Sequence, residues 1–389
     1  MTVEIINPTE ILSLIIVTTL IIFTLFEVNK LFNISKKEIF TIFIYHTFVS
    51  IIFLFFDLNS RHDASDWYRK STLNINIFFG NEFMYFFSAI LKLFGIKYLA
   101  QNMIFNYFGT LTLVILYSKV KEFFKRCNNK VMFYFYVTIV FVPGLSFWTS
   151  GITKDVLSIF GLALLYFSIS KKINYKFFLI SLLFIFFSRP FLLIFFILSF
   201  FIYKIILIIF SNKIQIEKKI ITIVILILIF YPMSLSLNIL KFYVPNMAIS
   251  FDLYYLIEKI INYIKVSQTF YSNETLGVPA DTYFYSRYFH FLFMPLKLDF
   301  QSIEFLYLFI ENLYLIFFIF FVIFNSTFNF RYGFLKINQL NRIFYLGIFL
   351  MLIYFPIAFS NYGIALRYKW LIIPFLIFFF LQIKVYRKN

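Results

Sequence analysis

Residues 220–237 read IITIVILILIFYPMSLSL, eighteen positions without one charged side chain. A helix of this length spans about 27 Å, close to the roughly 30 Å of hydrocarbon in a bilayer. Strands of a membrane barrel alternate apolar and polar residues, whereas 223–230 is apolar at every position. The stretch therefore predicts a membrane-spanning helix.

Apolar runs of this kind recur along the whole chain. Of its 389 residues, 62% are hydrophobic and only 14% are charged, whereas about a quarter of a soluble domain is charged. We expect an all-α polytopic membrane protein in which 1–389 form a single membrane domain. The runs predict eleven spans, near 11–28, 38–56, 100–118, 131–147, 155–170, 177–189, 190–210, 220–237, 305–324, 343–359 and 370–384.

The distribution of Lys and Arg predicts the orientation of the chain. With the amino terminus outside and the carboxyl terminus in the cytoplasm, the cytoplasmic segments hold 21 of the 35 Lys and Arg and 4 of the 18 Asp and Glu. Cytoplasmic loops of membrane proteins carry such an excess of positive charge. Topology thus accounts for the net charge of +17, and we expect no nucleic-acid partner.

Two long outer loops, 57–99 and 238–304, each contain an amphipathic segment. Residues 81–95 and 252–265 place their large apolar side chains on one helical face. Both segments are therefore predicted to be helices lying on the outer membrane surface. The cytoplasmic loops are short and lack a G-x-x-x-x-G-K-[ST] phosphate loop, which argues against ATP-driven transport by this chain.

Titratable side chains are densest in the loop directly after the second span. A carboxylate or imidazole there could act as a general base, so the candidate catalytic residues are Asp63, Asp66 and His62. A hydrophilic loop leaving the membrane would have the same composition. Nothing in the sequence requires a cofactor, although Asp57 with Asp63 and Asp66 leaves room for a divalent metal such as Mg²⁺ or Mn²⁺.

Charged side chains near the outer ends of other spans are candidates for binding an anionic substrate. Lys154 follows a tight turn in which Thr153 or Ser150 can cap the next helix. Arg189 interrupts an apolar stretch, so it either reaches the membrane rim or binds a phosphate. The candidate substrate-binding residues are Arg189, Arg367, Lys154, Lys369, Arg287 and Glu311. Glu311 lies two turns inside an apolar span and should face protein, where a structural hydrogen bond explains it equally well.

Four short motifs resemble the bacterial membrane proteins that polymerise O-antigen or capsule repeat units, the Wzy-type polymerases. Residues 147–155 (FWTSGITKD) resemble that family's FWSSGxxKD turn, and 188–190 (SRP) resemble its IRP. Residues 294–296 (MPL) with 311–312 (EN) resemble RP followed by EN, and 361–368 (NYGIALRY) resemble NxGxxxRY. Met294 stands where the family has Arg, which removes one cationic contact.

The resemblance implies a glycosyltransferase that joins polyprenyl-diphosphate-linked oligosaccharide units on the outer face of the bacterial inner membrane. Its partners would be that lipid-linked oligosaccharide, membrane lipid and a chain-length regulator. The first outer loop also resembles the lipid-linked-sugar glycosyltransferases of the GT-C type, so we expect a GT-C-like fold. Arg189 and Arg367, helped by Lys154 and Lys369, would then hold the diphosphate leaving group.

Three alternatives remain open at this point. A single-sugar transferase of the GT-C type would share the same loop. A flippase of lipid-linked oligosaccharides would place its charges at mid-span on both sides of a cavity. A membrane O-acyltransferase would need a buried His, and His46, the only His within a span, is expected to be a hydrogen-bonded core residue.

Overall fold

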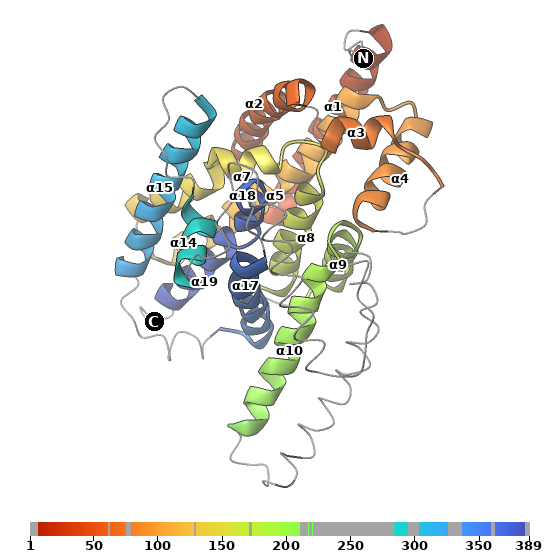
Figure 1. Cartoon of the computed structure of the whole chain (residues 1–389). Helices are drawn as coiled ribbons and strands as arrows, with labels where there is room; N and C mark the ends of the chain where they lie inside the picture. Colours follow the sequence, from red (N-terminus) through yellow and green to blue (C-terminus); the bar gives the residue numbers. More distant parts are fainter. Residues whose placement is uncertain are drawn as a thin grey trace. The chain divides into compact units, whose positions relative to one another are not determined.

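The computed structural model describes residues 7–60, 63–74, 79–127, 130–170, 173–210, 217, 220, 284–294, 303–325, 337–358 and 362–385. Every regular element in these ranges is a helix, which confirms the all-α prediction for the part of the chain described (Figure 1). The contacts divide the chain into two compact units, where we expected one membrane domain. Unit 1 comprises Met1–Leu193, Phe318–Asn341 and Ile373–Asn389, and unit 2 comprises Ile194–Phe317 and Arg342–Ile372.

The helices follow one another with short connections. The first half of the chain contains α1 (Pro8–Phe32), α2 (Lys36–Ser60), α3 (Asp63–Arg69), α4 (Gly80–Leu93), α5 (Tyr98–Cys127), α6 (Lys130–Val137), η1 (Thr138–Phe141), α7 (Pro143–Trp148), α8 (Lys154–Ile169) and α9 (Tyr175–Ser188). The second half contains α10 (Phe191–Ile209), α14 (Phe284–Phe293), α15 (Ile303–Asn325), α17 (Gln339–Ala358), α18 (Tyr362–Tyr368), η3 (Lys369–Leu371) and α19 (Ile373–Val385).

Six helical segments of the described ranges are long and apolar enough to cross a membrane. They correspond to the predicted spans near 11–28, 38–56, 100–118, 190–210, 343–359 and 370–384. The helices at 155–170, 177–189 and 305–324 are apolar but did not qualify as full spans, and 220–237 lies outside the described residues. The six segments fit a multi-pass membrane protein, and the count of eleven spans stays a prediction.

The prediction of one span over 131–147 is wrong. The segment consists of α6, the 3-10 helix η1 and α7, with Val142 in an extended conformation between the last two. Pro143 has no N–H to donate and its ring disfavours helical geometry in the residue before it. The proline therefore ends the preceding helix and begins α7 at a position where its fixed φ is suited to a helix.

Unit 1 is built around α5 and α8, whose side chains are largely buried. Helices α1, α2 and α8 pack on α5, and α9 runs back along α8 as an antiparallel hairpin (Figure 1). Gly161 permits this close packing, because an added Cβ would lie 2.8 Å from Ile185 Cγ1. The hairpin brings the beginning of α8 and the end of α9, more than 30 residues apart, to the same end of the helix pair.

The helix predicted at 81–95 is confirmed as α4. Its apolar face packs partly against protein, since Phe83 stacks on Phe187 of α9 and Phe87 contacts Phe105 of α5. At its carboxyl end Leu93 and Phe94 are 70% and 77% exposed. Its location on the membrane surface stays a prediction, and the second predicted amphipathic helix, 252–265, lies outside the described residues.

Candidate functional site

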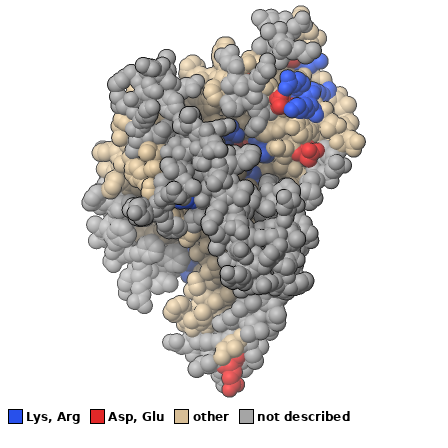
Figure 2. Space-filling model, in the orientation of Figure 1, with Lys and Arg blue, Asp and Glu red and all other residues tan. Residues whose placement is uncertain are grey.

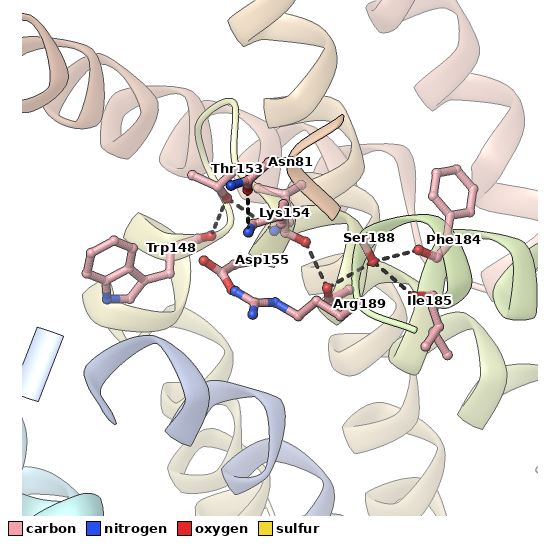
Figure 3. Close-up of polar contacts among 11 residues, drawn as sticks. Asn81, Trp148, Thr153, Lys154, Asp155, Phe184, Ile185, Ser188 and Arg189 are labelled. Atoms are coloured by element: carbon pink, nitrogen blue, oxygen red, sulfur yellow. Dashed lines mark hydrogen bonds and ion pairs between the residues drawn. The ribbon is translucent and has the colours of Figure 1, made fainter. Parts of the chain in front are cut away.

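The open end of the α8–α9 hairpin carries a buried ion pair. Thr153 caps α8 by accepting a hydrogen bond from the Val156 amide at 3.3 Å, as predicted, so Asp155 lies in the first helical turn. Arg189 follows the last residue of α9 and its guanidinium donates to the Asp155 carboxylate (Figure 3). The side chains of Arg189 and Asp155 are only 8% and 2% exposed. The arginine predicted to bind phosphate is thus held by a carboxylate within the chain.

Hydroxyl groups below this ion pair fix the geometry of the hairpin. Ser158 of α8 and Ser188 of α9 share a hydrogen bond of 2.9 Å, and both are fully buried. Ser158 also donates to the Lys154 carbonyl at 2.8 Å (Figure 3). Because neither helix can slide without breaking these bonds, the backbone on both sides of the ion pair is held in register.

Lys154 lies next to the ion pair but is partly exposed. Its Nζ donates to Asn81 Oδ1 of α4 at 2.6 Å and lies 5.9 Å from the centre of the Trp67 ring of α3. Trp67 belongs to a buried cluster that also contains Ala64, Met84 and Tyr98. This cluster holds α3 and α4, the two helices of the first predicted outer loop, beside the beginning of α8.

The candidate general bases occupy different positions in this loop. Asp66 is on α3 with a side chain 33% exposed, where it forms ion pairs with Lys70, at 2.8 Å, and with Arg69. The hydrogen bond from Lys70 keeps the pKa of Asp66 below its ordinary value, which makes this carboxylate a weaker base. Asp63 is the first residue of α3, and His62 lies outside the described residues.

Figure 2 shows that the charged side chains visible in this view gather over α3, while most of the other described surface is uncharged. The exposed members on this helix are Arg69 and Lys70, with Asp66 between them and the solvent-exposed edge. Beneath them, Lys92 of α4 donates to the Tyr68 carbonyl and covers its ring at 4.0 Å. Burial lowers the pKa of Lys92, and the neighbouring Lys97 lowers it further.

Asp57, considered above only as a metal ligand, is fully buried at the end of α2. Its Oδ2 accepts a hydrogen bond of 2.6 Å from the Tyr98 hydroxyl. Within the described residues, no group of three or more His, Cys, Asp or Glu side chains lies close enough together to hold a metal ion. Asp57 and Tyr98 therefore act as a pair that joins α2 to α5.

Unit 2 contains a second buried ion pair. Lys369 Nζ lies 3.5 Å from Glu311 Oε1 of α15 and donates to Asn312 Oδ1 at 2.8 Å. The side chains of Lys369 and Glu311 are 0% and 3% exposed, and Tyr307 donates to the same carboxylate. The prediction that Glu311 faces protein is confirmed.

The other predicted cations of unit 2 lie on short helices that pack together. Arg287 and His290 are partly buried on α14, which contacts α18, the helix that carries Arg367. Burial lowers the pKa of both Arg287 and His290. The structure thus joins Glu311 to Lys369 directly, and places Arg287 and Arg367 on neighbouring helices.

Sequence reasoning missed the partners of these cations. Asp155 directly follows Lys154 in the motif and was visible as an acidic residue in a first helical turn, but its pairing across a hairpin with Arg189 has no local signal. It also missed the polar side chains at every fourth position of α5, Tyr98, Asn102, Asn106 and Thr110, which line one helical face. The prediction that His46 is a hydrogen-bonded core residue is confirmed, since it is fully buried and bonded to Asn106 and Thr149.

Comparisons with known proteins add no relative to this description. No protein-family model, no curated protein and no solved structure matches the chain.

Proposed function

We propose that this protein is a membrane glycosyltransferase that polymerises polyprenyl-diphosphate-linked oligosaccharide repeat units on the outer face of the bacterial inner membrane. One observation carries the proposal. Two pairs of the motifs that resemble repeat-unit polymerases meet in space: Lys154-Asp155 with Arg189, and Glu311-Asn312 with Lys369. Charge buried in an apolar protein is costly and is usually retained for a function.

In the proposed reaction an acceptor hydroxyl attacks the anomeric carbon of the donor unit. The bond from that carbon to the diphosphate oxygen breaks, and the polyprenyl diphosphate leaves with the bonding electrons. Arginine suits this leaving group because its planar guanidinium donates two parallel hydrogen bonds to phosphate oxygens. Arg189 and Arg367 have this role, with Lys154, Lys369 and Arg287 adding positive charge and Glu311 orienting Lys369.

A carboxylate of the first outer loop takes the proton of the attacking hydroxyl. Asp63 is preferred over Asp66, because the ion pairs with Lys70 and Arg69 stabilise the ionised form of Asp66. His62 is the alternative base. A positioned base of this kind accelerates a reaction by about 10²- to 10⁴-fold.

A flippase of the same lipid-linked units is the second candidate. The observation in its favour is the Glu311–Lys369 pair, which lies buried among apolar helices of unit 2. A transporter uses such intramembrane charges along its substrate path.

The test uses the purified full-length protein in lipid vesicles with a polyprenyl-diphosphate-linked oligosaccharide that carries a fluorescent label. A polymerase produces a series of glycans whose masses rise by one repeat unit. A flippase moves the label across the membrane without changing its mass. Absence of longer products under conditions in which the labelled lipid crosses the membrane contradicts the proposal.

A further inference from the structure

A row of buried polar side chains joins α2 to α5. We call it the α2–α5 polar cluster, and its members, each at most 2% exposed, are His46, Ser50, Asn102, Asn106 and Thr110. Asn102 donates to Ser50 Oγ at 2.7 Å, and His46 Nδ1 lies 2.5 Å from Asn106 Oδ1. Polar groups in apolar surroundings keep their place only when they are hydrogen-bonded, so these pairs fix α2 against α5.

The cluster also reaches a third element, the segment 149–153 between α7 and α8. His46 Nε2 lies 3.0 Å from Thr149 Oγ1, and the Ser50 hydroxyl donates to the Ser150 carbonyl at 2.8 Å. Thr149 and Ser150 are fully buried. The segment that leads into the first turn of α8 is therefore hydrogen-bonded to α2 at two successive residues.

Two glycines allow this close approach. A Cβ on Gly109 of α5 would lie 1.9 Å from the Thr149 carbonyl oxygen and 2.4 Å from His46 Cε1. A Cβ on Gly151 would lie 1.9 Å from the ring of Phe53 on α2. The segment is thus enclosed between the two helices, and its position follows theirs.

We infer that His46 is a positioning residue that sets the place of Lys154 and Asp155 by holding Thr149. The Asn106 carbonyl oxygen accepts from Nδ1, which assigns the imidazole proton to Nδ1 and turns Nε2 toward Thr149. From Thr149 the chain continues to Thr153, the cap of α8, and then to Lys154 and Asp155. The consequence for catalysis rests on the proposed function, whereas the structural coupling does not.

The test reads the segment directly, by fluorine NMR of the full-length protein labelled with 5-fluorotryptophan. The chain has three Trp residues, of which Trp148 precedes Thr149 and Trp370 belongs to unit 2. His46→Ala and Thr149→Val should each shift the Trp148 resonance and leave the Trp370 resonance in place. Both variants should lose between about 10-fold and 100-fold in polymerisation, the range expected for a small misplacement of reacting groups.

Thr149→Val keeps the shape of the side chain and removes only its hydroxyl, so it changes the contact without opening a cavity. His46→Gln keeps a donor and an acceptor and should restore part of the activity. Because His46 acts through Thr149, the variant with both His46→Ala and Thr149→Val should lose no more than His46→Ala alone. Ile42→Ala is the matched control, one turn away on α2 and 1% exposed but without a polar atom, and should leave the Trp148 resonance unchanged.

An unchanged Trp148 resonance in both His46→Ala and Thr149→Val overturns the inference, as does full additivity in the double variant. A protein that shows the coupled NMR shifts but makes no polymer supports the positioning role and contradicts the proposed function.

Discussion

The ion pair between Asp155 and Arg189 predicts a large difference between single and double substitutions. Removing one member of a buried ion pair leaves an uncompensated charge and costs about 3–5 kcal/mol, and the 2% and 8% exposures place this pair in that class. We therefore expect Asp155→Asn or Arg189→Met to lower the free energy of unfolding by about 3–5 kcal/mol each. Replacing both by apolar residues, Asp155→Leu with Arg189→Met, should leave stability within about 1–4 kcal/mol of the wild type in either direction.

The assay is equilibrium unfolding of the purified protein in mixed micelles, combined with polymerisation of a lipid-linked oligosaccharide. Glu27→Gln is the control, since Glu27 pairs with Lys30 at the surface with side chains 65% and 76% exposed. That substitution should cost less than about 1 kcal/mol. The double variant should be folded and inactive, because it restores apolar packing but has no guanidinium for the diphosphate.

Two results would refute this reasoning. A single substitution at Asp155 or Arg189 that costs no more than Glu27→Gln would show that the buried pair does not hold the α8–α9 hairpin. A folded double variant that polymerises at the wild-type rate would remove Arg189 from the substrate-binding residues.

Three further predictions follow from the topology, a close contact and an ion pair. Cys127, in the loop 119–130, should react with a membrane-impermeant thiol reagent only from the cytoplasmic side, and labelling from outside would reverse the orientation. Gly109→Ala should lower the free energy of unfolding by at least about 1–3 kcal/mol in micelles, because its Cβ would overlap Thr149, and an unchanged stability would contradict the packing described. Since the pKa of Asp66 is lowered in the fold, mainly by Lys70, its stabilisation is present above its ordinary pKa of 3.8 and is lost as the pH falls through the folded value. Hydrogen exchange of α3 should therefore accelerate at acid pH in the wild type and depend less on pH in Asp66→Asn, and equal pH profiles would disprove the linkage.

Much of the fold could be predicted from the sequence because the signals were local. Hydrophobic runs gave six segments able to span a membrane, and a helical periodicity gave α4. The cap at Thr153 depends on residues three positions apart, so it too could be read from the sequence. The inward orientation of Glu311 followed from the cost of exposing a carboxylate to lipid.

The rest depends on residues far apart in the chain. Composition could not distinguish one span from three short helices over 131–147, because the break at Pro143 is set by one backbone position. The carboxylate partners of Arg189 and Lys369 lie 34 and 58 positions away, and no periodicity specifies which side chain ends beside which. The α2–α5 polar cluster could have been suspected from its four-residue spacing, but its contact with Thr149 required the structure.

The most direct test of the proposed function is the stoichiometry of the reaction with a purified lipid-linked repeat unit. Mass spectrometry would measure the glycans that remain on lipid and the free polyprenyl diphosphate in the same sample. We predict one free polyprenyl diphosphate for each new glycosidic bond, and neither product from Arg189→Met paired with Asp155→Leu. Lipid-linked units that stay single while no diphosphate is released would contradict the assignment as a polymerase.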